Sequence, residues 1–281
     1  MLIGAHISSA GGISNAPARA KEIGCNCVQI FSASPRIWKR PPINEAETCK
    51  FVEQKKQNDI KKSVIHAIYL VNLASENPES LLKSRSVIEF DLNIDSLTEG
   101  SGVVVHLGSH QGRGFEAVKE QLVEQLKIIL DKTPINSTFL IENSAGQNGK
   151  IASELQEIRW LLDSVGSPRL GWCMDTCHAY ANGFELRNKE TSTQKNIFTE
   201  IDNLGLWDSL KVIHVNDSRD PFDSGRDRHA NIGDGEIGNE VLASFLSHPK
   251  IKKLPLILEV PGLDGNGPDA ENVVRLTQLC Q

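Results

Sequence analysis

Short apolar runs recur along the chain and alternate with longer segments of helical periodicity. The runs are rich in β-branched residues and many are apolar at consecutive positions, which is typical of strands buried on both faces of a parallel sheet. We predict eight such strands, at Leu2–Ile7, Cys27–Phe31, Ser63–His66, Gly102–His106, Thr138–Glu142, Leu170–Asp175, Lys211–Val215 and Pro255–Val260.

The segments between these runs carry apolar residues at spacings of three and four, the period of an amphipathic helix. The clearest series are Val87, Phe90, Ile94 and Leu97; Phe115, Val118, Leu122, Leu126 and Ile129; and Ile151, Leu155, Ile158 and Leu162. Eight strands alternating with about eight helices predict an α/β fold, a closed (β/α)8 TIM barrel whose active site lies at the C-terminal ends of the strands. An open doubly wound sheet fits less well, because the chain has no Gly-x-Gly-x-x-Gly turn.

Composition narrows the class of protein without naming a function. Hydrophobic residues make up 39% and charged residues 23% of the chain, as in ordinary globular proteins. No apolar run reaches the roughly 20 residues of a membrane span, and the N-terminus does not resemble a signal peptide. No composition shift marks a domain boundary, so we expect one domain over residues 1–281, in the cytoplasm and without a membrane partner. The six cysteines show no Cys-x-x-Cys spacing and are expected to be free thiols.

Residues that bind divalent metals stand at the ends of six successive predicted strands. They are His66, His106, Glu142, Asp175, His214 and Glu259. A single histidine or acid at a strand end is more often an ordinary hydrogen-bonded residue. In a β/α barrel, however, the C-terminal strand ends converge on one mouth. Six in a row therefore predict a multinuclear metal site.

Three further candidates lie just beyond strand ends: His178, and the Asp-x-His pair Asp227 and His229. The set of nine is too large for one tetrahedral ion, and with one bridging carboxylate it suits three. Imidazole and carboxylate ligands favour zinc, and carboxylates also admit manganese or iron. Neighbouring divalent ions suit phosphoryl-ester hydrolysis, because they can hold the attacking hydroxide and stabilise the leaving oxygen. The net charge of −6 argues only weakly against a nucleic-acid partner, since bound ions are not counted in it.

Seven motifs follow one another along nearly the whole chain. They are Gly4-Ala5-His6-Ile7-Ser8-Ser9-Ala10-Gly11-Gly12, His66-Ala67-Ile68-Tyr69-Leu70-Val71-Asn72-Leu73-Ala74, His106-Leu107-Gly108-Ser109-His110, Glu142-Asn143-Ser144-Ala145-Gly146-Gln147, Cys173-Met174-Asp175-Thr176-Cys177-His178-Ala179, His214-Val215-Asn216-Asp217-Ser218 with Asp227-Arg228-His229-Ala230-Asn231-Ile232-Gly233, and Pro255-Leu256-Ile257-Leu258-Glu259. Each piece is moderately specific. In this order they resemble the endonuclease IV type of abasic-site (AP) endonuclease, AP endonuclease family 2.

The resemblance implies a zinc-dependent, monomeric enzyme of base-excision repair. Such enzymes cut double-stranded DNA on the 5′ side of an abasic site, leave a 3′-hydroxyl and clear blocked 3′ ends, with metal-bound hydroxide as the nucleophile. Three ions are implied. The first has His66, His106 and the bridging Glu142; the second has Glu142, Asp175, His214 and Glu259; the third has His178, Asp227 and His229. Glu142 and Glu259 are the expected catalytic carboxylates, with Glu259 also orienting the water.

The resemblance also implies contacts with DNA. Family members bend the duplex and insert side chains at the lesion, where a missing base lowers the cost of unstacking. The matching positions are Arg36, Tyr69 and Leu70, and further DNA contacts are expected from Asn72 and Arg228. Lys39 and Arg40 join Arg36 around Trp38 in a local basic patch.

Three places depart from the family's usual pattern: Ser34, Ile68 and the segment Asn148-Gly149-Lys150. They alter expectations about loops and DNA contacts and leave the nine ligand candidates intact. The main alternative is a metal-dependent sugar isomerase or epimerase on a similar barrel. A non-catalytic lesion-binding protein is the other alternative. The third ligand set and the residues expected to wedge into DNA argue against the sugar isomerase or epimerase. The open ligand set argues against the non-catalytic protein, because structural zinc sites are normally closed.

Overall fold

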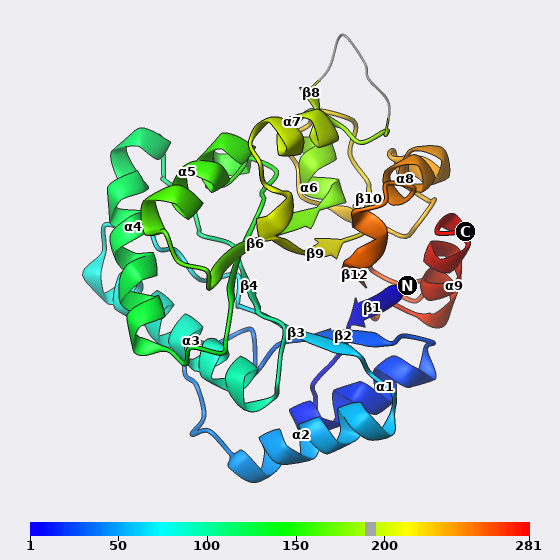
Figure 1. The fold of residues 1–281 in the computed structure, drawn as a ribbon, viewed down its shortest axis with the longest axis horizontal. Coiled ribbons are helices and arrows are strands. Elements are labelled where there is room, and N and C mark those ends of the chain that lie inside the picture. Colours follow the sequence, from blue (N-terminus) through cyan, green and yellow to red (C-terminus); the bar gives the residue numbers. More distant parts are fainter. Residues whose placement is uncertain (189–194) are drawn as a thin grey trace.

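The computed structural model describes residues 1–188 and 195–281, and in this part of the chain eight parallel strands close into a barrel surrounded by helices (Figure 1). The order around the barrel is β1-β12-β9-β6-β5-β4-β3-β2. The strands are β1 Leu2–His6, β2 Cys27–Ile30, β3 Lys62–His66, β4 Val103–Val105, β5 Phe139–Glu142, β6 Leu170–Asp175, β9 Leu210–His214 and β12 Pro255–Leu258. All eight predicted strands and the TIM barrel are confirmed.

Helices connect successive strands, as right-handed βα crossovers require. They are α1 Ala16–Glu22, α2 Glu45–Gln57, α3 Pro78–Leu97, α4 Phe115–Lys132, α5 Leu155–Val165, α6 Thr176–Ala181, α7 Ile197–Asn203, α8 Gly238–Leu246 and α9 Ala270–Leu279. Local chemistry explains the start of α3, where the Asn77 side chain accepts from two backbone N–H groups and Pro78 takes the first helical position. The expected helical series from Ile151 is wrong at its start, because α5 begins only at Leu155. Ile151 is buried in the preceding loop, where its N–H donates to the carbonyl of Gly108.

The barrel interior is filled by one apolar layer with a residue from almost every strand. Its buried members are Cys27, Val64, Val104, Leu140, Cys173, Val212 and Ile257, with Leu2 packed against them. Gly4 of β1 lies beside this layer, and a Cβ there would come within 2.7 Å of both the Cys27 carbonyl oxygen and Ile257. Glycine is therefore required where β1 closes the barrel against β2 and β12.

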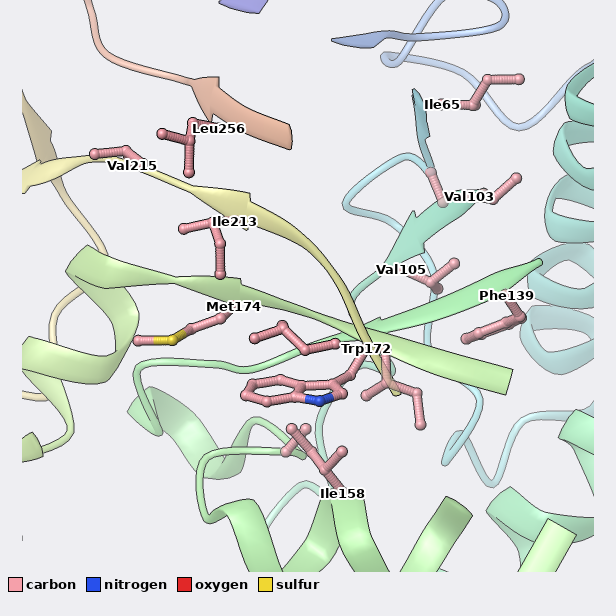
Figure 2. Packing of buried hydrophobic residues seen from close by; sticks show 14 of the residues in the cluster. Ile65, Val103, Val105, Phe139, Ile158, Trp172, Met174, Ile213, Val215 and Leu256 are labelled. Carbon is pink, nitrogen blue, oxygen red and sulfur yellow. The ribbon is translucent and has the colours of Figure 1, made fainter. Parts of the chain in front are cut away.

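Neighbouring residues on the same strands face outward and pack beneath the helices. Figure 2 shows this layer, in which Trp172 lies against Ile158 of α5 and Val103, Val105 and Phe139 line the adjacent strands. The Trp172 indole N–H donates to the carbonyl of Leu206 at 3.0 Å, so its burial leaves no donor unpaired. The strands are thus apolar on both faces, which is why the sequence shows runs rather than alternation.

Two short strand pairs lie outside the barrel. β7 (Phe184–Glu185) pairs with β8 (Lys195–Asn196), and β10 (Asp217–Ser218) pairs antiparallel with β11 (His229–Ala230). The buried carboxylate of Asp217 accepts backbone N–H groups from several residues between 233 and 238, which orders the loop beyond β11. Across the described residues, no helix is long and apolar enough to span a membrane.

Candidate metal centre at the mouth of the barrel

The candidate ligands lie one layer above the apolar interior of the barrel. Successive side chains of a strand point to opposite faces, so the residue two positions after an interior residue points inward again. His66 follows Val64 in this way, and Glu142 follows Leu140. The same step gives Gln29, His106, Asp175, His214 and Glu259 on their strands. On β1 it starts from Gly4, which pairs with Cys27 and Ile257 of the apolar layer, and gives His6.

Glu142 lies at the centre of this upper layer and is fully buried. Its Oε1 atom lies 3.1 Å from Nδ1 of His214 and 3.4 Å from Nδ1 of His178. Its Oε2 atom lies 3.1 Å from Nε2 of both His66 and His106. The carboxylate therefore faces four imidazoles on two sides, the position that a bridging ligand would occupy.

The candidate ligand atoms form three groups, and within each group all of these atoms lie within 4.8 Å of one another. The groups are His66, Glu142, His214 and Glu259; His106, Glu142 and His178; and Asp175, His178 and His229. Asp227 adjoins the third group, with Oδ1 at 3.0 Å from Nε2 of His178 and 3.4 Å from Nε2 of His229. All nine predicted ligands thus meet at one mouth. The groups share Glu142 and His178 and differ from the partition that the family resemblance implies, which stays a prediction.

Backbone and side-chain acceptors favour one tautomer for three histidines of the site: His66, His178 and His214. Nδ1–H of His66 donates to the Ala67 carbonyl at 2.6 Å and that of His178 to the Asn143 carbonyl at 2.9 Å. A carbonyl only accepts, so in the neutral form of these rings, the form that binds a metal, Nε2 carries the lone pair. Neutral His214 has the opposite tautomer. Its Nε2–H donates to Oε1 of Gln29 at 2.8 Å, so Nδ1 carries the lone pair.

This arrangement fits bound cations. In their neutral forms His66 and His214 direct lone pairs at oxygens of Glu142, and two acceptors so close repel each other unless a proton or a metal cation lies between them. The Nε2 atoms of His178 and His229 are buried and, among the described residues, have no partner with hydrogen-bond geometry. Both atoms nevertheless lie close to Oδ1 of Asp227, at 3.0 and 3.4 Å. Unpaired buried nitrogens are rare without a reason. Imidazole and carboxylate together are a donor set for zinc, manganese or iron.

The electrostatics also indicate a place for positive charge. Burial alone would lower the pKa of His178, but Asp175 and Asp227 raise it to about 10. Burial would likewise raise the pKa of Glu142, but the surrounding imidazoles hold it well below its usual range. Without metal ions, the carboxylates raise the pKa values of His66, His178 and His214 and favour their protonated forms, whereas burial lowers the pKa of His106 to about 4. Divalent cations would take the place of those protons.

His6 and Gln29 were not predicted as site residues. The Gln29 amide donates to Oε1 of Glu259 at 2.5 Å, and Nδ1 of His6 lies 3.2 Å from the same oxygen. Oε2 of Glu259 faces His214 at 3.1 Å. Strand alternation carries the signal for both residues. Gln29 stands two positions after the interior residue Cys27, and His6 stands two positions after Gly4, the β1 residue in register with Cys27.

The residues expected to wedge into DNA differ in exposure. Tyr69, three residues after the end of β3, has 68% of its surface exposed. Leu70 beside it is half-buried against the core. Arg36 is exposed in the segment between β2 and α2. Tyr69 and Arg36 are therefore accessible to a ligand above the barrel.

Asn72 and Arg228 have structural partners. The Asn72 amide donates to the Ser109 carbonyl at 3.1 Å and its oxygen accepts from the Ala74 N–H at 3.0 Å. Arg228 forms a two-point ion pair with the buried carboxylate of Asp220. Their DNA contacts stay predictions, and each residue also stabilises a loop at the mouth.

Comparisons with known proteins agree with this geometry. A family model described as Xylose isomerase-like TIM barrel matches residues 17–278. The chain is 35% identical to a probable endonuclease 4 from Halothermothrix orenii over 97% of this chain and 98% of that protein. It is 36% identical to a probable endonuclease 4 from Thermosipho africanus over 99% of each. The chain belongs to the endonuclease IV family. The predicted resemblance is thereby confirmed.

A solved member of the endonuclease IV family has the same fold over its full length. Endonuclease IV from Thermus thermophilus aligns with a TM-score of 0.86 at 32% identity, covering 99% of this chain and 98% of that one. The departures expected at Ser34, Ile68 and 148–150 stay predictions, and the two folds agree over nearly the whole chain.

Proposed function

We propose that this protein is a metal-dependent endonuclease of DNA repair that hydrolyses the phosphodiester 5′ to abasic sites in double-stranded DNA and leaves a 3′-hydroxyl. We include the clearing of blocked 3′ ends in the proposal. The observation that carries it is the meeting of nine ligand residues around Glu142 at an open barrel mouth. Endonuclease 4 relatives over the full length of the chain support this substrate class.

The proposed ligands for three ions, with zinc the first choice, are His66, His106, Glu142, Asp175, His178, His214, Asp227, His229 and Glu259. When bound, divalent ions would lower the pKa of water toward neutrality and neutralise charge on the phosphate. The protein's share of the chemistry is to hold these side chains in fixed tautomers and rotamers.

Glu259 is the proposed residue for orienting the attacking water. Gln29 and His6 hold its Oε1 atom, and Oε2 faces the cluster. Beside it opens a cavity of about 360 Å³ lined in part by Phe31, Val260 and Pro261. We propose this cavity as the place for the sugar of an abasic site, whose missing base lowers the cost of unstacking.

The test is cleavage of a labelled duplex that carries one tetrahydrofuran abasic analogue, with an intact duplex as control. The analogue cannot undergo β-elimination, so a cut on its 5′ side must be hydrolytic. We expect cleavage by the metal-loaded wild type and none by Glu259→Gln, because the amide removes the negative charge that holds the water. A wild type that carries its metals and leaves the analogue intact would reject the proposed function, and the same protein would then be tested on sugars.

Tyr69→Ala is expected to lower kcat/KM on the abasic duplex by roughly tenfold to 100-fold, because loss of one aromatic stacking contact costs about 1–3 kcal/mol. The measurement is steady-state cleavage at several duplex concentrations. Ile135→Ala is the matched control, since Ile135 is 87% exposed and precedes β5 at the opposite end of the barrel. Equal rates for Tyr69→Ala and the control would remove Tyr69 from the DNA-binding surface.

A further inference from the structure

Lys150 brings a positive charge to the edge of the metal centre. Its ammonium Nζ lies 3.2 Å from Oδ2 of Asp227, with 30% of the lysine side chain and 22% of the aspartate side chain exposed. Lys150 stands in the segment Asn148-Gly149-Lys150, which is expected from the sequence to depart from the family pattern.

The backbone around Lys150 is fixed on both sides. Asn148 adopts a left-handed conformation with φ of 53°, which asparagine tolerates better than most residues. A Cβ on Gly149 would come within 2.5 Å of the His110 ring, so only glycine allows this close packing. The N–H of His110 donates to the Gly149 carbonyl at 2.9 Å, and the Ser109 hydroxyl donates to the Asn148 carbonyl at 2.6 Å. The loop after β4 thus holds Lys150 in place.

The two oxygens of Asp227 have different partners. Oδ1 faces the ring nitrogens of His178 and His229, where the third ion is proposed, and Oδ2 faces Lys150. The ammonium therefore leaves the inner oxygen available to a metal ion. Within residues 1–188 and 195–281, Asp227 is the only hydrogen-bond partner of Nζ. An ammonium has three donors, so two remain for another acceptor.

We propose that Lys150 is an additional substrate-binding residue of this active site, which contacts a phosphate of bound DNA from its position on the outer oxygen of Asp227. The inference rests on the proposed function. A partly exposed ammonium beside a cluster built for phosphodiester hydrolysis attracts the DNA backbone as a point charge. Asp227 contacts His178 and His229 through its other oxygen, so the ammonium lies one carboxylate away from the cluster that an approaching phosphate would reach.

The charge of Lys150 favours DNA binding but disfavours metal binding at Asp227. An ammonium paired with Asp227 reduces the attraction of that carboxylate for a divalent cation, because like charges repel across a short distance. Lys150 is therefore expected to weaken retention of one ion while strengthening DNA binding. A residue that merely supported the loop would weaken both when replaced, so the two effects together separate the roles.

The test compares Lys150→Met with wild type in two measurements. In the first, zinc retained by the DNA-free protein is followed while a chelator is titrated. In the second, binding of the tetrahydrofuran duplex is measured at several KCl concentrations in the Glu259→Gln background, so that no cleavage occurs. Lys150→Arg keeps the charge, and Lys119→Met makes the same change at a lysine that pairs with Glu116 on α4. Removing a partly exposed ion pair leaves most proteins folded.

We expect Lys150→Met to retain its most weakly held zinc at several-fold higher chelator and to bind the duplex about tenfold more weakly at low salt. Its log–log salt dependence should also fall by about one unit, as for loss of one phosphate contact. Lys150→Arg and Lys119→Met should behave as wild type in both measurements. Earlier loss of zinc, or unchanged duplex binding and salt dependence, overturns the proposal. If the parent protein itself does not prefer the abasic duplex, the proposed function fails first, which is a distinguishable result.

Discussion

Glu142→Gln is expected to lower kcat/KM on the abasic duplex by at least about 100-fold, because even loss of a group that only orients a metal ligand costs 10–100-fold. The amide keeps the size of the side chain, removes its charge and turns one acceptor into a donor. In Glu142, Oε2 faces His66 and His106, and Oε1 faces His214 and His178. The substitution replaces one of these two oxygens with an NH2 group, which cannot bind a metal ion. We also expect fewer metal ions per chain, measured by elemental analysis of the purified protein.

Glu185→Gln is the matched control, since Glu185 is also buried and pairs with Arg187 away from the cluster. It should retain both its metal content and its cleavage rate. If Glu142→Gln kept its full complement of ions and its activity, the position of Glu142 at the centre of the site would have no functional meaning.

Removal of divalent ions is expected to abolish cleavage and to lower Tm. Glu142, Asp175 and Glu259 are negative groups drawn into one buried layer, and their repulsion is compensated when cations bind. A ligand at 100 times its Kd stabilises a folded protein by about 2.7 kcal/mol, which for a chain of this size corresponds to a Tm change of roughly 5–10 °C.

The measurement is thermal unfolding followed by circular dichroism before and after chelation and dialysis, with cleavage assayed on the same samples. Adding back ZnCl2 should restore both Tm and activity, and MnCl2 tests the alternative ion. A chelated protein with unchanged Tm that still cuts the tetrahydrofuran duplex would show that the cluster holds no functional metal.

Much of this architecture could be predicted because the relevant information is local. The eight strands are short apolar runs, and the period of two within each strand determines which residue faces the interior. His66, Glu142 and Glu259 could therefore be assigned to one mouth from the sequence pattern alone. The helical boundary at Leu155 was misplaced because the buried Ile151 extends the apolar series into a loop.

Contacts between distant segments could not be predicted in the same way. The tautomer of His214 depends on Gln29, which is 185 positions away in sequence. The orientation of Glu259 depends on Gln29 and His6 from the first two strands. The pairing of Lys150 with Asp227 spans 77 positions and arises from the packing of two loops. Such contacts follow from the closed barrel and have no periodic signal of their own.

Because the inward side chains lie two residues above one apolar layer, strand register alone sets the height of most ligands within the barrel. The loops that follow the strands do not set that height. The loops can therefore change in length and sequence, and with them the proposed DNA contacts, while the strand residues proposed as ligands keep their positions. His178, Asp227 and His229 are the exceptions. His178 lies in the first turn of α6, directly after β6. For Asp227 and His229, the pairing of β10 with β11 and the carboxylate of Asp217 supply the rigidity that the barrel supplies elsewhere.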